Sequence, residues 1–172
     1  FKQKLGKVNL TVRGNMTYSK NEIIERDEAN NVYPYQMQKG YRVNQNKGLI
    51  ALGLFKDYDD IRNSPTQKYG PVMPGDIKYK DVNGDGAVDT DDRTFIGNPH
   101  PDFTFGFTNN FKYKDFDLSI FLQGSSGNDI LNLTQRSGTA NSMLGQNQLV
   151  EALDFWTPTN TDTNIPRPIN IE

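Results

Sequence analysis

The sequence predicts an all-β protein, built from antiparallel strands of a transmembrane β-barrel with long loops. Two observations lead to this prediction. Three segments alternate apolar and polar residues with a period of two, each over about ten residues, which is the length that a tilted membrane strand needs. One connection between these segments has two residues, whereas the others are long and rich in Asn, Gly and Pro.

The first predicted strand spans residues 5–18. Val8, Leu10 and Val12 share one parity with Met16 and Tyr18, whereas polar side chains occupy the other parity. This alternation predicts a strand with one apolar and one polar face.

Two further strands are predicted at 103–113 and 116–123. Their apolar parities carry mainly Phe, Leu and Ile, and only Lys114-Asp115 separates the two segments, which predicts a tight antiparallel hairpin. Alternation alone is equally typical of a half-buried sheet in a soluble sandwich. Aromatic residues at the ends of the apolar faces favour a membrane barrel, because such barrels carry aromatic girdles at both interfaces.

The unequal connections assign a direction to the strands. Short turns are periplasmic and long loops extracellular in outer-membrane barrels, so we expect 19–102 and 124–172 to be extracellular loops. Short helices are possible at Phe55–Arg62 and Gln146–Trp156, where apolar residues recur at helical spacing. The apolar parity would face lipid, and the polar parity would face the lumen; the polar set includes Lys7, Arg13, Asn15, Asn110, Lys112 and Asp117.

An acidic loop at 81–92 reads DVNGDGAVDTDD. It places oxygen-bearing residues at the positions that ligate Ca²⁺ in an EF-hand loop, with a Gly at the sixth position and Asp in place of the usual Glu at the twelfth. A Pro-containing segment precedes the loop and Gly97-Asn98-Pro99 follows it, so we expect no flanking helix pair and a structural clip rather than a sensor. The expected calcium ligands are Asp81, Asn83, Asp85, Asp89, Asp92 and the Ala87 carbonyl. Val88, at the eighth position, is expected to anchor the loop to a core.

Composition excludes several other functions. The 172 residues contain no Cys and one His, which leaves no thiolate or multi-histidine metal site and no cysteine nucleophile. With 19 basic and 21 acidic residues the net charge is −2, so nucleic-acid binding is not expected. No run of about 18 apolar residues exists, so no membrane-spanning helix is expected. The chain starts at Phe1, and we expect it to be a piece of a larger protein.

The stretch Pro74–Ile130, which contains the acidic loop and the hairpin, resembles the SusC/RagA family of TonB-linked outer-membrane transporters of Bacteroidetes. GLFKDYDDI at 53–61 and FWTPTNTDTNIPRP at 155–168 are similar to the same family. The resemblance implies part of the C-terminal half of a 22-stranded barrel in the cell outer membrane. It also implies that the transporter imports an oligosaccharide or peptide together with a SusD-like surface lipoprotein. TonB would supply the energy for import by contacting parts of the protein that are absent from this sequence.

Two other functions compete with this interpretation. The acidic loop is also similar to a dockerin loop, so the alternative is a soluble calcium-binding β-module of a cell-surface protein. A dockerin would carry two such loops, each followed by an amphipathic helix, and this chain has one loop. A polysaccharide-active enzyme is not expected, because no paired carboxylates stand out on one strand face.

Overall fold

The computed structural model describes residues 1–29, 33–132 and 149–168. The chain divides into two compact units. The first unit comprises residues 1–27, 38–45 and 97–130, and the second comprises 28–37, 46–96 and 131–172.

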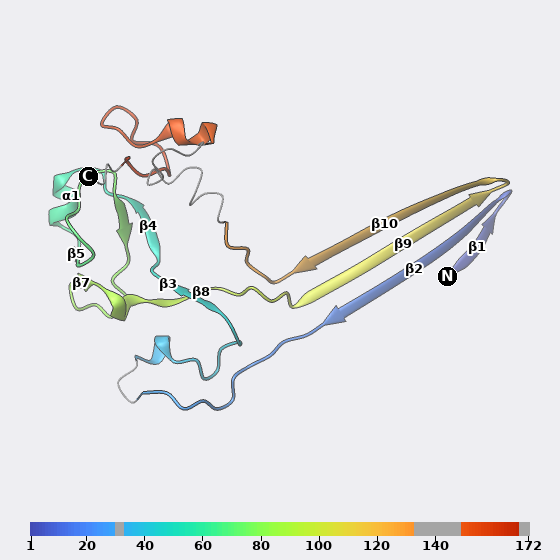
Figure 1. The fold of residues 1–172 in the computed structure, drawn as a ribbon, viewed down its shortest axis with the longest axis horizontal. Helices are drawn as coiled ribbons and strands as arrows, with labels where there is room; N and C mark the ends of the chain where they lie inside the picture. Colours follow the sequence, from blue (N-terminus) through green and yellow to red (C-terminus); the bar gives the residue numbers. More distant parts are fainter. Residues whose placement is uncertain (30–32, 133–148, 169–172) are drawn as a thin grey trace. The chain divides into compact units, whose positions relative to one another are not determined.

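The first unit is built on one antiparallel sheet with the strand order β1-β2-β9-β10 (Figure 1). Its strands are β1 (Lys2–Leu5), β2 (Val8–Tyr18), β9 (Phe103–Tyr113) and β10 (Phe116–Ser126). The predicted hairpin across Lys114-Asp115 is confirmed, since Tyr113 pairs with Phe116. The predicted pairing of the first long strand with β9 is also confirmed, although the connection between them runs through residues 19–102.

The predicted strand bounds need two corrections. Residues 5–18 do not form one strand, because Gly6 has a φ of 63° and turns the chain, so that Leu5 belongs to β1 and pairs with Val8. The positive φ favours Gly. The apolar parity also changes at this turn, since Leu5 is at an odd position whereas Val8, Leu10 and Val12 are at even positions. The last strand extends to Ser126, three residues beyond the predicted end.

The second unit contains short strand pairs instead of the irregular loop expected for most of 19–102. β3 (Asn46–Gly48) pairs with β8 (Thr94–Gly97), and β4 (Ala51–Leu54) pairs with β6 (Ile77–Tyr79). β5 (Thr66–Gln67) runs parallel to β7 (Ala87–Val88). Three 3-10 helices complete it, namely η1 (Pro34–Gln36), η2 (Thr90–Asp92) and η3 (Val150–Asp154).

Both predicted short helices are present in reduced form. The first is α1 (Tyr58–Arg62), which begins at the N-cap Asp57, whose carboxylate accepts the Asp60 N–H at 2.7 Å. The second is the 3-10 helix η3; its predicted start at 146–148 lies outside the described residues. In the described part of the unit, the buried apolar side chains are Phe55, Val88, Ala152 and Trp156.

Among the residues that the structure describes, no helix is long and apolar enough to cross a membrane.

Candidate functional site

The acidic loop is folded by its own carboxylates. The two oxygens of Asp81 accept the N–H groups of Gly84 and Gly86, at 2.6 and 2.9 Å. Further along, Asn83 accepts the Asp85 N–H at 3.0 Å and Asp85 accepts the Ala87 N–H at 2.8 Å. These bonds are typical of Asx turns, in which a side-chain oxygen replaces a backbone acceptor. The side chains at 81, 83 and 85 therefore curl the chain inward, with one oxygen or more of each turned towards the loop backbone.

Asp92 closes the loop from its other end. Its side chain is 0% exposed, and its oxygens accept the Val82 N–H at 2.7 Å and the Asp89 N–H at 2.8 Å. A buried carboxylate is stable only when hydrogen bonds or a cation compensate for lost hydration. Asp92 therefore joins the first and last thirds of the loop, and the adjacent Val88, also 0% exposed, anchors the loop in the core as expected.

Two other expected ligands lie at the edge formed with β5. Asp89 accepts a hydrogen bond from the Lys68 ammonium at 2.8 Å, which lowers the pKa of that carboxyl below its usual range. The carbonyls of Gly86 and Val88 accept the N–H groups of Thr66 and Lys68 on β5. Because carbonyls alternate along a strand, the Ala87 carbonyl points away from β5.

The donor chemistry of the loop fits a hard cation. Every expected ligand is a carboxylate, an amide or a carbonyl oxygen, the type that Ca²⁺ prefers, and a carboxylate has about four lone-pair sites, so those already bonded to N–H groups keep capacity. Within the described ranges, however, no group of three or more Asp, Glu, His or Cys side chains is arranged to hold a metal ion. The flanking elements agree with the expected lack of a helix pair. Strand β6 precedes the loop, the 3-10 helix η2 forms its last three residues, and strand β8 follows it.

The sheet of the first unit separates apolar from polar side chains. Residues paired across antiparallel strands lie on the same face, so the register defines complete rows. The apolar rows are Leu10–Phe111–Leu118, Val12–Asn109–Ile120, Gly14–Phe107–Leu122 and Met16–Phe105–Gly124. The expected lipid-facing set Val8, Leu10, Val12, Phe105, Phe107, Leu118 and Ile120 thus shares one face.

Large apolar side chains on this face remain exposed in the described structure. Met16 is 71% exposed and Leu118 is 57% exposed. Where a Gly occurs in a row, a Phe ring covers it: a Cβ at Gly124 would lie 2.5 Å from the Phe105 ring. The face is therefore mainly apolar, with Asn109 as the one polar residue in these rows. Large exposed apolar faces mark contacts with a partner or a membrane.

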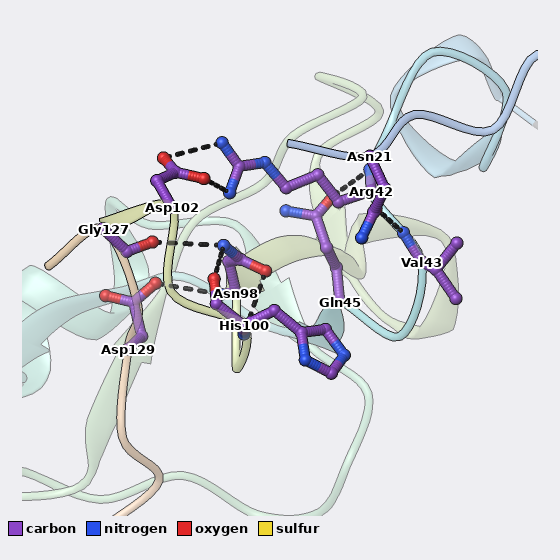
Figure 2. Close-up of polar contacts among 9 residues, drawn as sticks. All are labelled: Asn21, Arg42, Val43, Gln45, Asn98, His100, Asp102, Gly127 and Asp129. Atoms are coloured by element: carbon purple, nitrogen blue, oxygen red, sulfur yellow. Dashed lines mark hydrogen bonds and ion pairs between the residues drawn. The ribbon is translucent and has the colours of Figure 1, made fainter. Parts of the chain in front are cut away.

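A polar junction lies at the end of the sheet opposite the tight turns. Figure 2 shows its side chains. The Arg42 guanidinium makes a bidentate ion pair with Asp102, one contact of which measures 2.8 Å. This hydrogen-bonded pair lowers the pKa of Asp102 below its usual range. The backbone of Asp102 also bonds to Ser19 and Ser126, so one residue joins the ends of β2 and β10.

Asn98 extends the same junction. Its amide donates to the carbonyls of His100 and Gly127, at 2.7 and 3.1 Å, and its own N–H donates to Asp129 at 2.9 Å (Figure 2). Arg42, Asn98 and Asp102 were not predicted from the sequence. The two charged partners are 60 residues apart and belong to no periodic pattern, so no local signal could have identified them.

Comparison with known proteins supports a relationship to one class. The chain is 44% identical over 102 residues to TonB-dependent receptor P3 of Formosa agariphila. The aligned region covers 58% of this chain and 10% of that receptor. It is 40% identical over 121 residues to TonB-dependent receptor P26 of the same organism, covering 70% of this chain and 12% of the relative. For TonB-dependent receptor P39 the identity is 30% over 156 residues, with 15% of the relative covered. No protein-family model matches the chain.

The homology is partial, since the chain spans between 10% and 15% of the length of these curated relatives. TonB-dependent receptors are transporters rather than enzymes, and they reside in the outer membrane. The expected outer-membrane localisation is therefore confirmed at the level of this class.

Proposed function

We propose that the chain is part of a SusC/RagA-type outer-membrane transporter that imports a glycan or peptide through a 22-stranded barrel. TonB would supply energy through parts of the protein outside this sequence. Strands β2, β9 and β10 would form part of the barrel wall, and most of 19–102 and 124–172 would lie on the extracellular side.

The observation that carries this proposal is the two-faced sheet. One face is apolar and exposed, and the other is polar; in water such a sheet would need a cover on its apolar face, whereas in a membrane that face contacts lipid and the polar face lines an aqueous lumen. The homology to TonB-dependent receptors agrees with this arrangement.

The proposal is tested with the full-length gene in its native bacterium. We expect the protein in outer-membrane fractions, and we expect its deletion to abolish growth on one glycan or peptide in a panel of single nutrients. Deletion of TonB should abolish the same growth. Growth on every nutrient after deletion, or recovery of the protein in soluble fractions, would refute the assignment.

A SusD-like surface lipoprotein is the proposed partner of the extracellular loops. The test is affinity purification of the tagged full-length protein from mildly solubilised outer membranes. A surface lipoprotein recovered in equal amounts supports the pairing, and a transporter that purifies without any lipoprotein contradicts it.

We also propose that the acidic loop binds one Ca²⁺ through Asp81, Asn83, Asp85, Asp89, Asp92 and the Ala87 carbonyl. Its support is the hard-oxygen donor set and the closely spaced carboxylates, whose mutual repulsion a cation would relieve. The ion would act as a structural clip on the second unit.

A further inference from the structure

The polar face of the four-stranded sheet carries an excess of positive charge. The register places Lys2, Lys4, Arg13 and Lys112 on this face, against the single carboxylate of Asp117. Lys112 lies 3.7 Å from Asp117, so the described strands leave three cations without a balancing acid on the face. The chain as a whole has a net charge of −2. The positive excess is therefore a property of this face and not of the composition.

The same face is hollowed beside the row that contains Arg13, although Arg13 itself is not part of the lining. A trough of about 470 Å³ is lined by Asn15, Gly106, Phe121 and Gln123, together with the hydroxyl residues Thr104 and Ser125. Gly106 forms its floor: a Cβ there would lie 2.5 Å from the Asn15 amide oxygen and 3.5 Å from the Phe121 ring. Glycine at this position keeps the space between the amide and the ring open.

Phe121 is the one large apolar side chain in the polar rows of the long strands. It is 58% exposed, and it shares a row with Arg13 through Thr108, whereas the next row contains Asn15, Gly106 and Gln123. An exposed ring beside amide and hydroxyl groups matches a ligand with one apolar face and many hydroxyls, as in a sugar ring. A guanidinium in the adjacent row matches a carboxylate or a similar oxyanion, which it binds with two hydrogen bonds.

We propose that this trough is a subsite for an acidic carbohydrate, with Phe121 against the sugar ring, Asn15 and Gln123 on its hydroxyls, and Arg13 on a carboxylate or sulfate group. The inference rests on the proposed transporter function, because it places the trough on the lumen side of the wall. It adds the substrate class, which neither the fold nor the homology provides.

Charge complementarity favours this occupant over a neutral one. A neutral protein segment packed on this face would leave Arg13 and the lysines desolvated without partners, which is costly. An anionic ligand neutralises them, and a face of one sign raises the local concentration of such a ligand before it binds.

The experiment uses the full-length transporter purified in detergent, with binding followed by calorimetry. The probes are an oligogalacturonate, a sulfated oligosaccharide, a neutral gluco-oligosaccharide of equal length and a polyglutamate peptide. We expect one of the two acidic oligosaccharides to bind at least about tenfold more tightly than the neutral one, the size of a lost charge-assisted hydrogen bond. This affinity should fall as the ionic strength rises.

The variants separate the subsite from general effects. Arg13→Gln should weaken binding of the acidic oligosaccharide about tenfold and leave the neutral one unchanged, whereas Phe121→Ala should weaken both. Ser119→Ala, on the same face but outside the trough, is the matched control and should retain affinity within about twofold. Each variant is first checked for its level in the outer membrane.

Three outcomes would overturn the subsite: equal affinity for acidic and neutral sugars, an Arg13→Gln variant that binds like the parent, or tighter binding of the acidic peptide than of either acidic sugar. In each of these cases a transporter that still requires TonB for nutrient uptake leaves the proposed function standing. Loss of TonB dependence instead contradicts the proposed function itself.

Discussion

At the scale of single residues, Gly75 shows how one missing side chain permits packing. It has a φ of 88°, and a Cβ would lie 2.4 Å from the Trp156 ring, which is one of the buried groups of the second unit. Gly75→Ala should lower the free energy of local opening by about 2–4 kcal/mol, through backbone strain and displacement of the indole. Hydrogen exchange of the Trp156 amide, which donates to Ile165 at 2.9 Å, measures this.

Gly40 is the matched control for the packing part of that effect. Its φ is 84°, but nothing lies within 4 Å of the added Cβ. Gly40→Ala should therefore cost only the backbone strain, about 1 kcal/mol. Similar costs at both positions would show that the contact with Trp156 is unimportant.

The Arg42–Asp102 pair predicts a pH dependence at the end of the sheet. The pKa of Asp102 is lowered in the folded protein, so the stability from the pair is fully present above the usual Asp pKa of about 3.9. It is lost as the pH falls through the lower folded value. Exchange of the Ser19 and Asp102 amides should therefore be faster in Asp102→Asn than in the parent at pH 7, and the difference should vanish at the lowest pH. An unchanged difference in acid would exclude the ion pair as its cause.

The sequence predicted the roles of some residues in the acidic loop, but not the roles of residues whose contacts form only in the folded protein. The fixed spacing of the acidic loop identified Val88 as an anchor, because this apolar residue stands at the eighth position, between two ligand positions. It also placed Asp92 at the end of the loop, but not its burial, which depends on N–H groups from Val82 to Asp89. The contacts of Arg42 and Gly75 depend on chain segments brought together only by folding, so they left no local pattern.

At the scale of elements, long strands were predictable and short ones were not. The three long strands of eleven residues each repeat the period of two often enough to be recognised. The paired strands β3 to β8 have two to four residues, too few for a periodic signal. Their pairing depends on the buried ring of Phe55 and on side chains such as Gln67, whose amide bonds to Ile77 and Tyr79.

A charged substitution should have different costs in stability on the two faces of β10. Leu118 and Ser119 are neighbours on opposite faces of the edge strand β10, and both pair with the same strand, β9. Leu118→Arg should cost about 2–4 kcal/mol if that face contacts lipid near the bilayer centre, whereas Ser119→Arg should cost much less. Unfolding of the full-length protein in lipid vesicles by denaturant measures both. Equal costs would indicate a soluble sheet covered on both faces.

The acidic loop predicts an effect of chelation on its unit. If Ca²⁺ clips the loop, chelator should increase protease cleavage within 46–96 of the full-length transporter, and added Ca²⁺ should reverse it. Asp85→Ala should cause the same increase without chelator, because it removes one ligand. Asp59→Ala is the control, because it removes an acidic side chain from the exposed helix α1, outside the loop. It should leave cleavage unchanged. If neither the chelator nor Asp85→Ala changes the rate of protease cleavage, the role of Ca²⁺ as a structural clip is excluded.

At the scale of the whole molecule, the exposed apolar face determines how residues 1–172 behave when separated from the rest of their protein. The sheet presents Met16, Leu118 and Leu122 without cover in the described structure, and its edge strand β10 pairs on one side only. Exposed apolar faces and long unpaired edges both promote association.

Expressed alone in aqueous buffer, residues 1–172 should therefore form oligomers or aggregates rather than a monomer, whereas the full-length protein in detergent should remain soluble. Size-exclusion chromatography with light scattering measures the state. The triple substitution of Leu118, Ile120 and Leu122 by Ser is the informative variant, since it makes the exposed face of β10 polar while keeping the register. We expect it to reduce association of the isolated chain and to prevent assembly of the full-length protein in the membrane, because the same face cannot suit water and lipid. A monomeric parent chain with intact β structure would show that another surface covers this face, and it would remove the main support for the barrel wall.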